Sequence, residues 1–372
     1  MFINSIQIEN LRGIRKGKIK GLDKVNILLG PNGAGKSTIL EAIYLISAWA
    51  KRIDDLRGVN KENYVVSRRT GRGDWSTARQ ILWHNMDTEK EIKICITTND
   101  RLLDFRVPYS LTHIDSKNQS SVFIKMPREI LKKPSHNRLS RVYITSTLSL
   151  YDPLEKAYKG SFIGELRGLF NKFYNNIIKT LEKIIFIDSM FLRNPKLLEE
   201  RLWSRLLAKR LDKEIIKVIR EGYEPLAEDL TYAPLYPNMY TLFLKLPHTS
   251  ISIDVLGDGA RNAIGLMAPL VLAKDTIVLL EDPEIHQHPG GIGVLMRFIL
   301  NIIKKNNIQL IMSTQSIEFV RITLRLCEDL AIPAKTFYIE RENGELHVRV
   351  LKELDVDALM KLGIDPRFLG AF

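Results

Sequence analysis

The stretch GPNGAGKST at residues 30–38 decides the fold class of this chain. It fits the pattern G-x-x-x-x-G-K-[ST], and it lies between an apolar run at residues 25–29 and a mostly apolar run at residues 39–43. A buried strand, a glycine-rich turn and a helix, in this order, form the phosphate-binding P-loop. The pattern therefore predicts an α/β fold of the P-loop NTPase type and a site for a nucleoside triphosphate. A glycine-rich turn with an incidental lysine is the alternative, and the flanking strand and helix disfavour it.

Each part of this stretch has a physical role toward a triphosphate. Its glycines permit positive φ angles and close backbone approach, so successive N–H groups can point at the phosphates. The helix N-terminus adds a partial positive charge. Lys36 supplies a point charge for the β- and γ-phosphates, and Ser37 supplies a hydroxyl for Mg²⁺. We expect the nucleotide to contact Asn32, Gly33, Ala34, Gly35, Lys36, Ser37 and Thr38.

The composition indicates a large core and no membrane span. The chain has 372 residues, of which 45% are hydrophobic, and a net charge of +12. Residues 1–8 look like a strand rather than a signal peptide, and charged residues interrupt the longest apolar stretch, residues 263–280. Cys95 and Cys327, the only cysteines, lie in apolar surroundings, as is typical of core residues in a reduced, cytoplasmic protein. The richness in Ile, Lys, Arg and Glu is common in proteins of thermophiles.

Four apolar segments predict buried parallel strands, because near-continuous apolar runs are typical of strands covered on both faces. Each segment is followed by polar residues, and the ligands of open α/β sheets bind beyond the C-terminal ends of the strands. We therefore expect four segments that are distant in the sequence to converge on one nucleotide. They are residues 25–29, 184–187, 276–280 and 308–312.

The remaining segments predict additions to this core. An antiparallel subsheet is indicated by strand-like patterns at residues 91–98, 102–107, 121–126 and 141–145. Basic stretches interrupt this region at residues 51–72 and 128–141, and a helical pattern covers residues 166–221. Strand patterns return at residues 240–246, 251–255, 336–340 and 345–350, before a short helical pattern. We expect a P-loop lobe at residues 1–190, a helical lobe or arm at 191–235, and a lobe with a short C-terminal tail at 236–372.

Residues 276–284, TIVLLEDPE, form an apolar strand that ends in acids. A P-loop ATPase needs a carboxylate at this place to hold Mg²⁺, and a base or orienting group for the attacking water. Glu281 fits the first role by its position, together with Ser37. Asp282 fits the second role, and Glu284 is a candidate to share it. An acidic turn after a buried strand is the alternative, which the P-loop in the same chain disfavours.

Two further polar segments lie where a nucleotide site needs them. Gly257, Asp258 and Gly259 precede a helical pattern, so they predict a second anion site at a helix N-terminus. Alone, Gly-x-Gly is more often a matter of loop geometry, but its place shortly before Glu281 favours a functional role. Gln315 follows the strand at residues 308–312, where a polar sensor of the γ-phosphate would lie. Ser316 also fits a helix N-cap, and both interpretations can hold together.

The order of P-loop, Gly-Asp-Gly, Glu-Asp-Pro-Glu and Thr-Gln-Ser resembles the ABC-type ATPase heads of the OLD (overcoming lysogenization defect)-like AAA ATPases. These are relatives of the SMC and RecF-type ATPases of chromosome maintenance and recombination repair. Residues 6–14, IQIENLRGI, look like the first strand of that group and its following basic residue, Arg12. The resemblance covers residues 2–316, with divergent inserts. It implies a mostly parallel central sheet with an antiparallel subsheet and a helical insertion lobe, ATP and Mg²⁺ as cofactors, and Arg12 at the nucleotide.

The resemblance also implies a role for each motif. Residues 256–259 match the signature motif, which in this group meets the γ-phosphate held by a partner subunit, so a homodimer that encloses ATP is expected. Glu281 matches the Mg²⁺ carboxylate and Asp282 the catalytic glutamate. Residues 313–316 match the switch motif, which usually contains histidine. The shorter Asp282, and Gln315 in place of histidine, predict slow hydrolysis or a base role shared with Glu284.

Three features bear on what such an ATPase would act on. OLD-like nucleases carry a C-terminal metal nuclease domain, whereas this chain ends 56 residues after Ser316, so no intrinsic nuclease is expected. No sustained heptad run predicts a coiled-coil arm. Basic clusters can neutralise the phosphates of DNA or RNA, or can be a solvated surface. They contain Arg68, Arg69, Arg72, Lys132, Lys133, Arg138 and Arg141.

Three functions remain open at this point. The first is an ATP-driven dimeric switch in nucleic-acid processing or genome defence. The second is the nucleotide-binding subunit of a transporter, which the inserts and the Gly-Asp-Gly signature disfavour. The third is a module that binds ATP with little hydrolysis and regulates a separately encoded effector, such as a toxin or nuclease; Asp282 and Gln315 motivate it.

Overall fold

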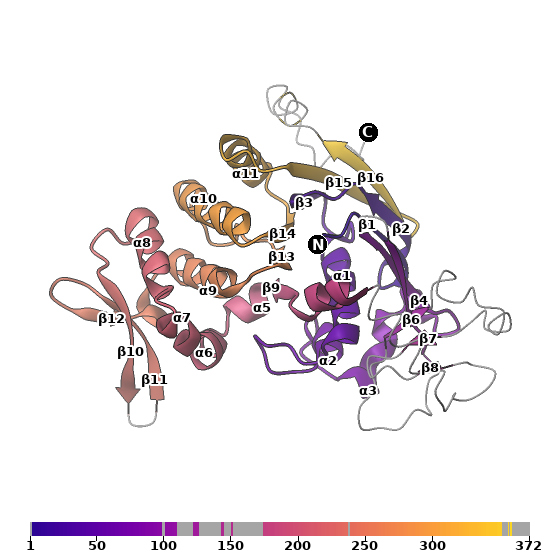
Figure 1. Ribbon diagram of the computed structural model, residues 1–372, viewed down its shortest axis with the longest axis horizontal. Helices are drawn as coiled ribbons and strands as arrows, with labels where there is room; N and C mark the ends of the chain where they lie inside the picture. The colour runs from indigo at the N-terminus through magenta and orange to yellow at the C-terminus, as the bar shows by residue number, and fades with distance from the viewer. Residues whose placement is uncertain are drawn as a thin grey trace.

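The computed structural model describes residues 2–98, 101–109, 122–125, 143–144, 150–151, 174–236, 239–351, 356 and 358. These residues form one large mixed sheet with helices on both faces, and one small antiparallel sheet (Figure 1). The strands of the large sheet lie side by side in the order β8 (Leu150–Tyr151), β7 (Tyr143–Ile144), β6 (Phe123–Lys125), β5 (Arg101–Val107), β4 (Ile92–Thr98), β1 (Ser5–Leu11), β2 (Ile14–Lys20), β16 (Glu345–Leu351), β15 (Ala334–Glu342), β3 (Val25–Leu29), β14 (Ile308–Thr314), β13 (Thr276–Glu281) and β9 (Ile185–Ile187).

The parallel part of this sheet contains the four strands that the apolar segments predict. β3, β14, β13 and β9 are parallel neighbours in that order. Every residue of β3 and β14 is buried, as expected for strands covered on both faces. The register pairs Glu281 with Ser313 and Thr314 with Leu29, so the C-terminal ends of the three strands meet at one edge. The predicted parallel arrangement of the four segments is confirmed, and their convergence on a nucleotide stays a prediction.

The antiparallel part is also present. β1 pairs with β2 and β4, and β4, β5, β6, β7 and β8 continue the sheet in antiparallel steps. β15 runs parallel to β3 and antiparallel to β16, and this pair joins the two parts of the sheet. The predicted C-terminal strand pair is therefore confirmed, whereas the predicted C-terminal helix and the basic stretch at residues 128–141 lie outside the described residues.

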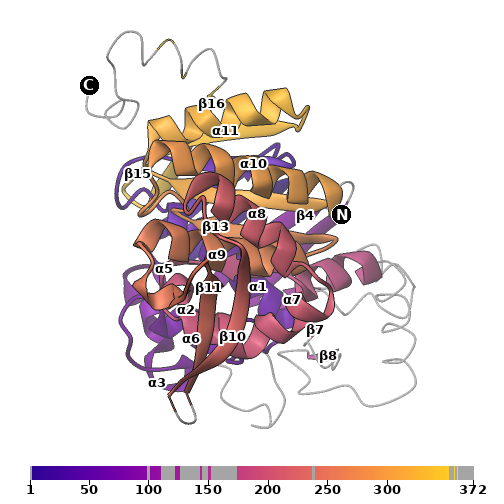
Figure 2. The same cartoon turned by 90° about the vertical axis from the view of Figure 1, so that its left-hand side faces the viewer.

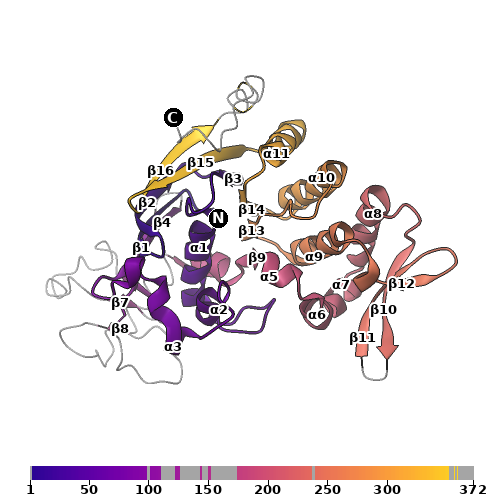
Figure 3. The ribbon, with the colours of Figure 1, turned by 180° about the vertical axis from the view of Figure 1, so that it is seen from behind.

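The long helices lie on opposite faces of the parallel strands. α1 (Lys36–Ala50) packs in one hydrophobic cluster, and α9 (Asp258–Leu272), α10 (Pro289–Lys305) and α11 (Ile317–Asp329) pack in the other. Side chains of β13 alternate between the two clusters, since Leu279 belongs to the first and Leu280 to the second. Figure 3 shows this arrangement from behind, with α1 and the three other helices separated by the sheet. α1 therefore begins on one side of the strand ends, and α9 begins on the other.

Short elements surround the α1 side of the sheet. α2 (Lys61–Ser67) packs against α1, and α3 (Trp75–Ala78), η1 (Arg79–Leu82) and η2 (His84–Met86) follow it. The residues of the stretch 51–72 thus fold back onto the P-loop helix. Among the helices of the described residues, none is long and apolar enough to cross a membrane. Cys95 and Cys327 are both buried and free, as predicted for core residues.

A helical segment and a small sheet lie on the α9 side. The helices are α5 (Ser189–Leu192), α6 (Pro195–Leu198), the π-helical turn η4 (Glu199–Trp203), α7 (Ser204–Ala208) and α8 (Asp212–Gly222). β10 (Asp229–Tyr236), β11 (Met239–Lys245) and β12 (Ser250–Ser252) follow, and the hairpin of β10 and β11 projects from the body of the molecule (Figure 2). The sequence patterns predict no strand at β10, and residues 253–255, which they assign to a strand, form the 3₁₀ turn η5.

Candidate nucleotide site

The turn between β3 and α1 has the backbone that phosphate binding requires. A Cβ atom on Gly30 would lie 2.2 Å from the carbonyl oxygen of Ile339 in β15, so this position accepts only glycine. Gly33 and Gly35 have φ angles of 77° and 100°, in the left-handed region that favours glycine. Gly35 is the N-cap of α1 and has no side chain to cap it. The first N–H groups of the helix are therefore not taken by a cap, in a position suited to an anion.

Lys36 lies at the centre of this turn. Its Nζ donates hydrogen bonds to the carbonyl oxygens of Gly30, at 2.7 Å, and Pro31, at 2.9 Å. Burial lowers the pKa of Lys36, and the nearby carboxylates of Asp282 and Glu284 act in the opposite direction. The ammonium group thus faces two of the acids that the strand pattern of residues 276–284 singles out. Of the other predicted residues, Asn32 and Gly33 are exposed, whereas Ala34 and Thr38 are buried.

Ser37 and Glu281 lie together, as a shared Mg²⁺ site requires. The Ser37 hydroxyl lies beside the Glu281 carboxylate and favours its ionised form. Burial raises the pKa of Glu281, while the guanidinium of Arg68 and the Ser37 hydroxyl oppose this rise. Mg²⁺ prefers oxygen ligands and commonly takes only one or two from the protein, with phosphates and water supplying the others. In the described part of the chain no group of three or more His, Cys, Asp or Glu side chains could hold a metal, so the hydroxyl and carboxylate pair fits Mg²⁺ better than a closed metal site.

The two remaining acids are held by the end of β14. Asp282 has a φ of 45°, its N–H donates to the Ser313 carbonyl at 3.1 Å, and the Ser313 hydroxyl donates to Asp282 Oδ1 at 3.1 Å. Glu284 Oε1 accepts from the Thr314 hydroxyl and from the N–H of Gln315, at 3.3 Å. Glu284 Oε2 is buried without a hydrogen-bond partner, and burial raises the pKa of this side chain. Both carboxylates are therefore positioned near Lys36, and the Gln315 residue is exposed beside them.

Arg12 contacts α1 and α2 in this structure, and its place at the nucleotide, which the resemblance implies, stays a prediction. Its Nε lies 2.5 Å from Glu41 Oε2, and another guanidinium nitrogen donates to the Val65 carbonyl at 2.6 Å. Burial lowers the pKa of Arg12 to about 10, against the effect of Glu41. Glu41 belongs to α1 and also pairs with Arg68 and Arg69. Arg12 thus anchors the middle of α1, and none of its recorded contacts is with residues 30–38.

The Gly257, Asp258 and Gly259 segment begins α9 on the far side of the sheet. Gly259 accepts a hydrogen bond from the Gln287 side chain at 2.9 Å, and a Cβ atom there would lie 3.0 Å from the carbonyl oxygen of His286. No atom lies within 4 Å of the corresponding position on Gly257. Among the hydrogen bonds and ion pairs of the described residues, none joins residues 257–259 to residues 30–38. Within one chain, this segment does not complete the P-loop site.

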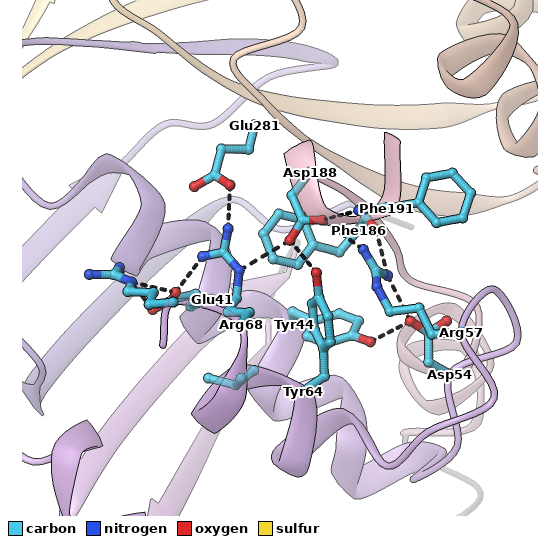
Figure 4. Close-up of polar contacts among 12 residues, drawn as sticks. Glu41, Tyr44, Asp54, Arg57, Tyr64, Arg68, Phe186, Asp188, Phe191 and Glu281 are labelled. Carbon is cyan, nitrogen blue, oxygen red and sulfur yellow. Dashed lines mark hydrogen bonds and ion pairs between the residues drawn. The ribbon is translucent and has the colours of Figure 1, made fainter. Parts of the chain in front are cut away.

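A buried network of charges, which the sequence patterns did not reveal, surrounds the site. Figure 4 shows Asp188 between two arginines, with Arg57 at 3.0 Å and the Nε of Arg68 at 3.1 Å. Tyr64 donates to the same carboxylate at 2.5 Å, and Arg57 also pairs with Asp54 at 2.8 Å. Asp188 further caps α5 by accepting the N–H of Phe191. Asp188 is therefore an internal anchor for the stretch 51–72.

This network removes Arg68 from the basic surface that residues 51–72 could offer to nucleic acid, whereas Arg72 is exposed. The Arg68 side chain is 6% exposed and pairs with Glu41, Asp188 and Glu281. Arg69 is partly exposed, yet it also binds Glu41 and the Thr38 hydroxyl. Arginine-rich sequence looks alike whether it is solvated or buried against carboxylates, and the acids that pair with Arg68 come from distant segments. Lys132, Lys133, Arg138 and Arg141 lie outside the described residues.

The geometry agrees with comparisons to known proteins. Residues 25–321 match the family described as "AAA domain, putative AbiEii toxin, Type IV TA system". The chain belongs to this AAA-domain family. It is 21% identical to an "ATP/GTP phosphatase" of Helicobacter pylori (strain ATCC 700392 / 26695) over 361 residues, which cover 92% of this chain and 93% of that protein. It is 43% identical to the DNA replication and repair protein RecF of Bacillus thuringiensis (strain Al Hakam) over 47 residues, 13% of this chain and 12% of RecF.

Solved structures support the same fold for this AAA-domain protein. The crystal structure of an SMC head bound to the C-terminal winged-helix domain of ScpA superposes with a TM-score of 0.51, at 12% sequence identity. The match covers 97% of this chain and all of that chain. The predicted α/β fold is therefore confirmed, and the AAA-domain family agrees with the predicted resemblance to AAA ATPases. The protein is a nucleotide-binding ATPase domain of the AAA type.

Proposed function

We propose that this protein hydrolyses ATP at a site completed by a second copy of the chain, and that hydrolysis drives a switch in nucleic-acid processing or genome defence. The observation that carries the proposal is the meeting of Lys36 and Ser37 with the acids at the end of β13 and just after it, at one edge of the sheet. These groups come from two segments that are far apart in the sequence, residues 30–38 and 276–284. An acidic turn without a function would be expected to lie in solvent rather than beside a buried lysine.

Each residue has a role in this reaction. Lys36 and the N–H groups of residues 33–38 bind the β- and γ-phosphates, and Ser37 and Glu281 hold Mg²⁺. Bound Mg²⁺ would neutralise charge on the phosphates. Asp282 orients the attacking water and accepts its proton, and the Ser313 hydroxyl holds this side chain in place.

The remaining roles fall to residues at the end of β14 and in the loop after β13. Glu284, with one buried oxygen free of partners, is the second candidate for the base. Gln315 contacts the γ-phosphate or the water.

In this proposal, residues 257–259 of a second copy complete the nucleotide site. α9 starts on the opposite side of the sheet from α1, so its N-terminus is directed away from the P-loop of its own chain. Gly257 has open space around it, which leaves room for the phosphate of another subunit. The proposed assembly is a homodimer with two ATP molecules, each between the P-loop of one subunit and residues 257–259 of the other.

The names of the relatives support the wider function. The Helicobacter protein is called a phosphatase of ATP and GTP, which supports hydrolysis of either nucleotide by this chain. RecF is named for DNA replication and repair, and the family description names a toxin system, which supports a role in nucleic-acid processing, genome defence or control of an effector. The net charge of +12 favours a polyanionic partner, DNA or RNA, in the cytoplasm.

A regulator that binds ATP with little hydrolysis is the second candidate. Asp282 is shorter than the glutamate of related ATPases, and its Oδ1 already accepts the Ser313 hydroxyl. A carboxylate held back in this way activates water less effectively. In this case the bound nucleotide, rather than its turnover, would control a separately encoded partner.

Phosphate release from ATP and GTP in Mg²⁺ distinguishes these candidates. We expect measurable turnover by the wild-type protein, and a loss of about 100-fold in Asp282→Asn with unchanged nucleotide affinity. Lys36→Ala should lose nucleotide binding, and Glu284→Gln should show whether this acid shares the base role. Turnover that survives Asp282→Asn would transfer the base role to Glu284. No turnover in the wild type, with tight ATP binding, would favour the regulator.

A further inference from the structure

Arg68 occupies a buried position at the edge of the nucleotide site. It follows the last residue of α2, and its side chain is 6% exposed. The guanidinium carbon lies 4.9 Å from the centre of the Phe186 ring. A planar guanidinium that stacks on a ring and donates to several oxygens has little freedom to move. Arg68 is therefore a fixed feature of this site rather than a surface charge.

Three carboxylates surround this guanidinium, and they differ in their other partners. Glu41 also pairs with Arg12 and Arg69. Asp188 also pairs with Arg57 and accepts hydrogen bonds from Tyr64 and the N–H of Phe191. These two acids keep cationic partners when Arg68 is removed.

Glu281 differs from these two acids. Its side chain is 12% exposed, and in the described part of the chain Arg68 is its sole ion-pair partner. The Ser37 hydroxyl lies beside this carboxylate and also favours its ionised form. Without Arg68, this carboxylate would keep a single hydroxyl partner and could adopt other rotamers. The structure thus makes the orientation of Glu281 depend on Arg68.

We propose that Arg68 is a positioning residue that orients Glu281 toward Ser37 for Mg²⁺. This inference rests on the proposed function, because it takes Ser37 and Glu281 as the metal ligands. Carboxylates that bind metals are commonly held by hydrogen-bond donors outside the ligand set, and loss of such a donor typically weakens metal affinity by about 10- to 100-fold. Arg68 makes no recorded contact with residues 30–38, so it should affect the binding of metal but not of the nucleotide itself.

Two binding measurements separate these effects. The affinity for Mn²⁺, a spectroscopic substitute for Mg²⁺, is measured by the electron paramagnetic resonance of free Mn²⁺ with a saturating non-hydrolysable ATP analogue. The affinity for a fluorescent ATP analogue is measured in EDTA. We expect Arg68→Gln to bind Mn²⁺ about 10-fold more weakly, and Arg68→Lys to lie between this variant and the wild type. Nucleotide affinity in EDTA should change less than about twofold, within the scatter of an unperturbed site.

Arg69→Gln is the matched control. Arg69 is the next residue and shares Glu41 with Arg68. It contacts the Thr38 hydroxyl but not Glu281, so its nucleotide affinity in EDTA is measured as well. Its Mn²⁺ affinity should match that of the wild type, so a loss in this variant as well would assign the effect to general disturbance of α2. Tighter Mn²⁺ binding by Arg68→Gln would also contradict the proposal, because it would mean that the guanidinium competes with the metal. If Arg68→Gln does not fold, Arg68→Lys decides the question, since a compact ammonium cannot span three carboxylates.

Glu281→Gln separates this inference from the proposed function. Weak Mn²⁺ binding by Glu281→Gln, together with wild-type binding by both Arg68 variants, would overturn the positioning role alone. Wild-type Mn²⁺ binding by Glu281→Gln would instead overturn the metal assignment on which the proposed function depends.

Discussion

Charged side chains around α1 are buried together with side chains of opposite charge. The ionised form of each acid is stabilised by the arginines that contact it. Burial alone would raise the pKa of Glu41, but Arg12, Arg68 and Arg69 together hold it below its ordinary value. Burial likewise works against the ionised form of Asp188, and Arg57 and Arg68 hold its pKa low. Removing one partner of such a group leaves a buried charge uncompensated, which commonly costs about 3 to 5 kcal/mol. The stability of this region therefore rests on matched charges.

Lys61 is a buried lysine beside α1, and the effect of its charge on stability can be tested by changing the pH. Burial lowers its pKa from 10.5 to about 8, and its Nζ donates to the Ser47 hydroxyl at 2.9 Å. Because the unfolded chain holds this proton more tightly, the buried charge destabilises the fold fully below pH 8, and the penalty disappears as pH rises to the unfolded value near 10.5. We expect Lys61→Met to be more stable than the wild type at pH 7, by on the order of 3 kcal/mol at most.

Urea unfolding of both proteins at several pH values checks this prediction. The advantage of Lys61→Met should shrink between pH 8 and pH 10.5, the range of the shifted pKa. Ser47 keeps its own hydrogen bond to the Tyr44 carbonyl in the variant, so no polar group is left without a partner. A stability difference that stays constant over this range would show that Lys61 does not titrate with a lowered pKa.

At the scale of elements, the P-loop turn depends on the strand beside it. β15 runs parallel to β3, and its backbone passes directly over the first residue of the turn. The glycine at this position thus has two functions: it allows the turn, and it lets β15 complete the sheet. The signature segment at the start of α9 has no such neighbour at Gly257.

Two alanine variants test this difference. Gly30→Ala should destabilise the protein by about 3 kcal/mol, because the new Cβ atom would meet the Ile339 carbonyl oxygen and the backbone would have to move. Gly257→Ala should leave the free energy of unfolding nearly unchanged, since nothing lies within 4 Å. Chemical denaturation of the two variants beside the wild type measures both effects. Equal stabilities for the two variants would contradict the role assigned to β15.

At the scale of the whole molecule, the two halves of the proposed site lie on opposite sides of the sheet. A single chain presents the P-loop on the α1 side and residues 257–259 on the α9 side. Two chains related by a two-fold axis can each supply the half that the other needs. The open space at Gly257 also makes it a better position for a blocking side chain than Gly259, which is already close to His286.

The solution mass of an Asp282→Asn variant, measured by light scattering, tests the proposed dimer. We expect a monomer without nucleotide and a dimer with Mg-ATP, because slow hydrolysis should preserve the closed state. Adding Gly257→Arg should keep ATP binding but prevent the dimer, since the side chain would fill the space reserved for the partner. A mass that does not respond to ATP would mean that residues 257–259 do not act on another subunit, or that the chains associate permanently.

Local patterns predicted the core of this protein well. The P-loop, the four parallel strands and the pairing of Ser37 with Glu281 follow from short apolar runs that end in polar residues, because parallel strands place their C-terminal ends at one edge. The sequence did not predict β10, because apolar and polar residues do not alternate clearly along it. Its strand conformation depends on pairing with β11. The ion pair of Arg12 with the buried Glu41 could not be predicted, because no local pattern joins these two residues.

The sequence by itself determined the fold class and the chemistry of the site, because glycine turns and apolar periodicity act over a few residues. Only the tertiary structure decided which charges face one another. The acids that pair with Arg68 come from α1, the N-cap of α5 and β13, and no local pattern joins residues so far apart. The side of the sheet on which α9 begins was also decided by packing, since it follows from the alternation of β13 side chains between two cores.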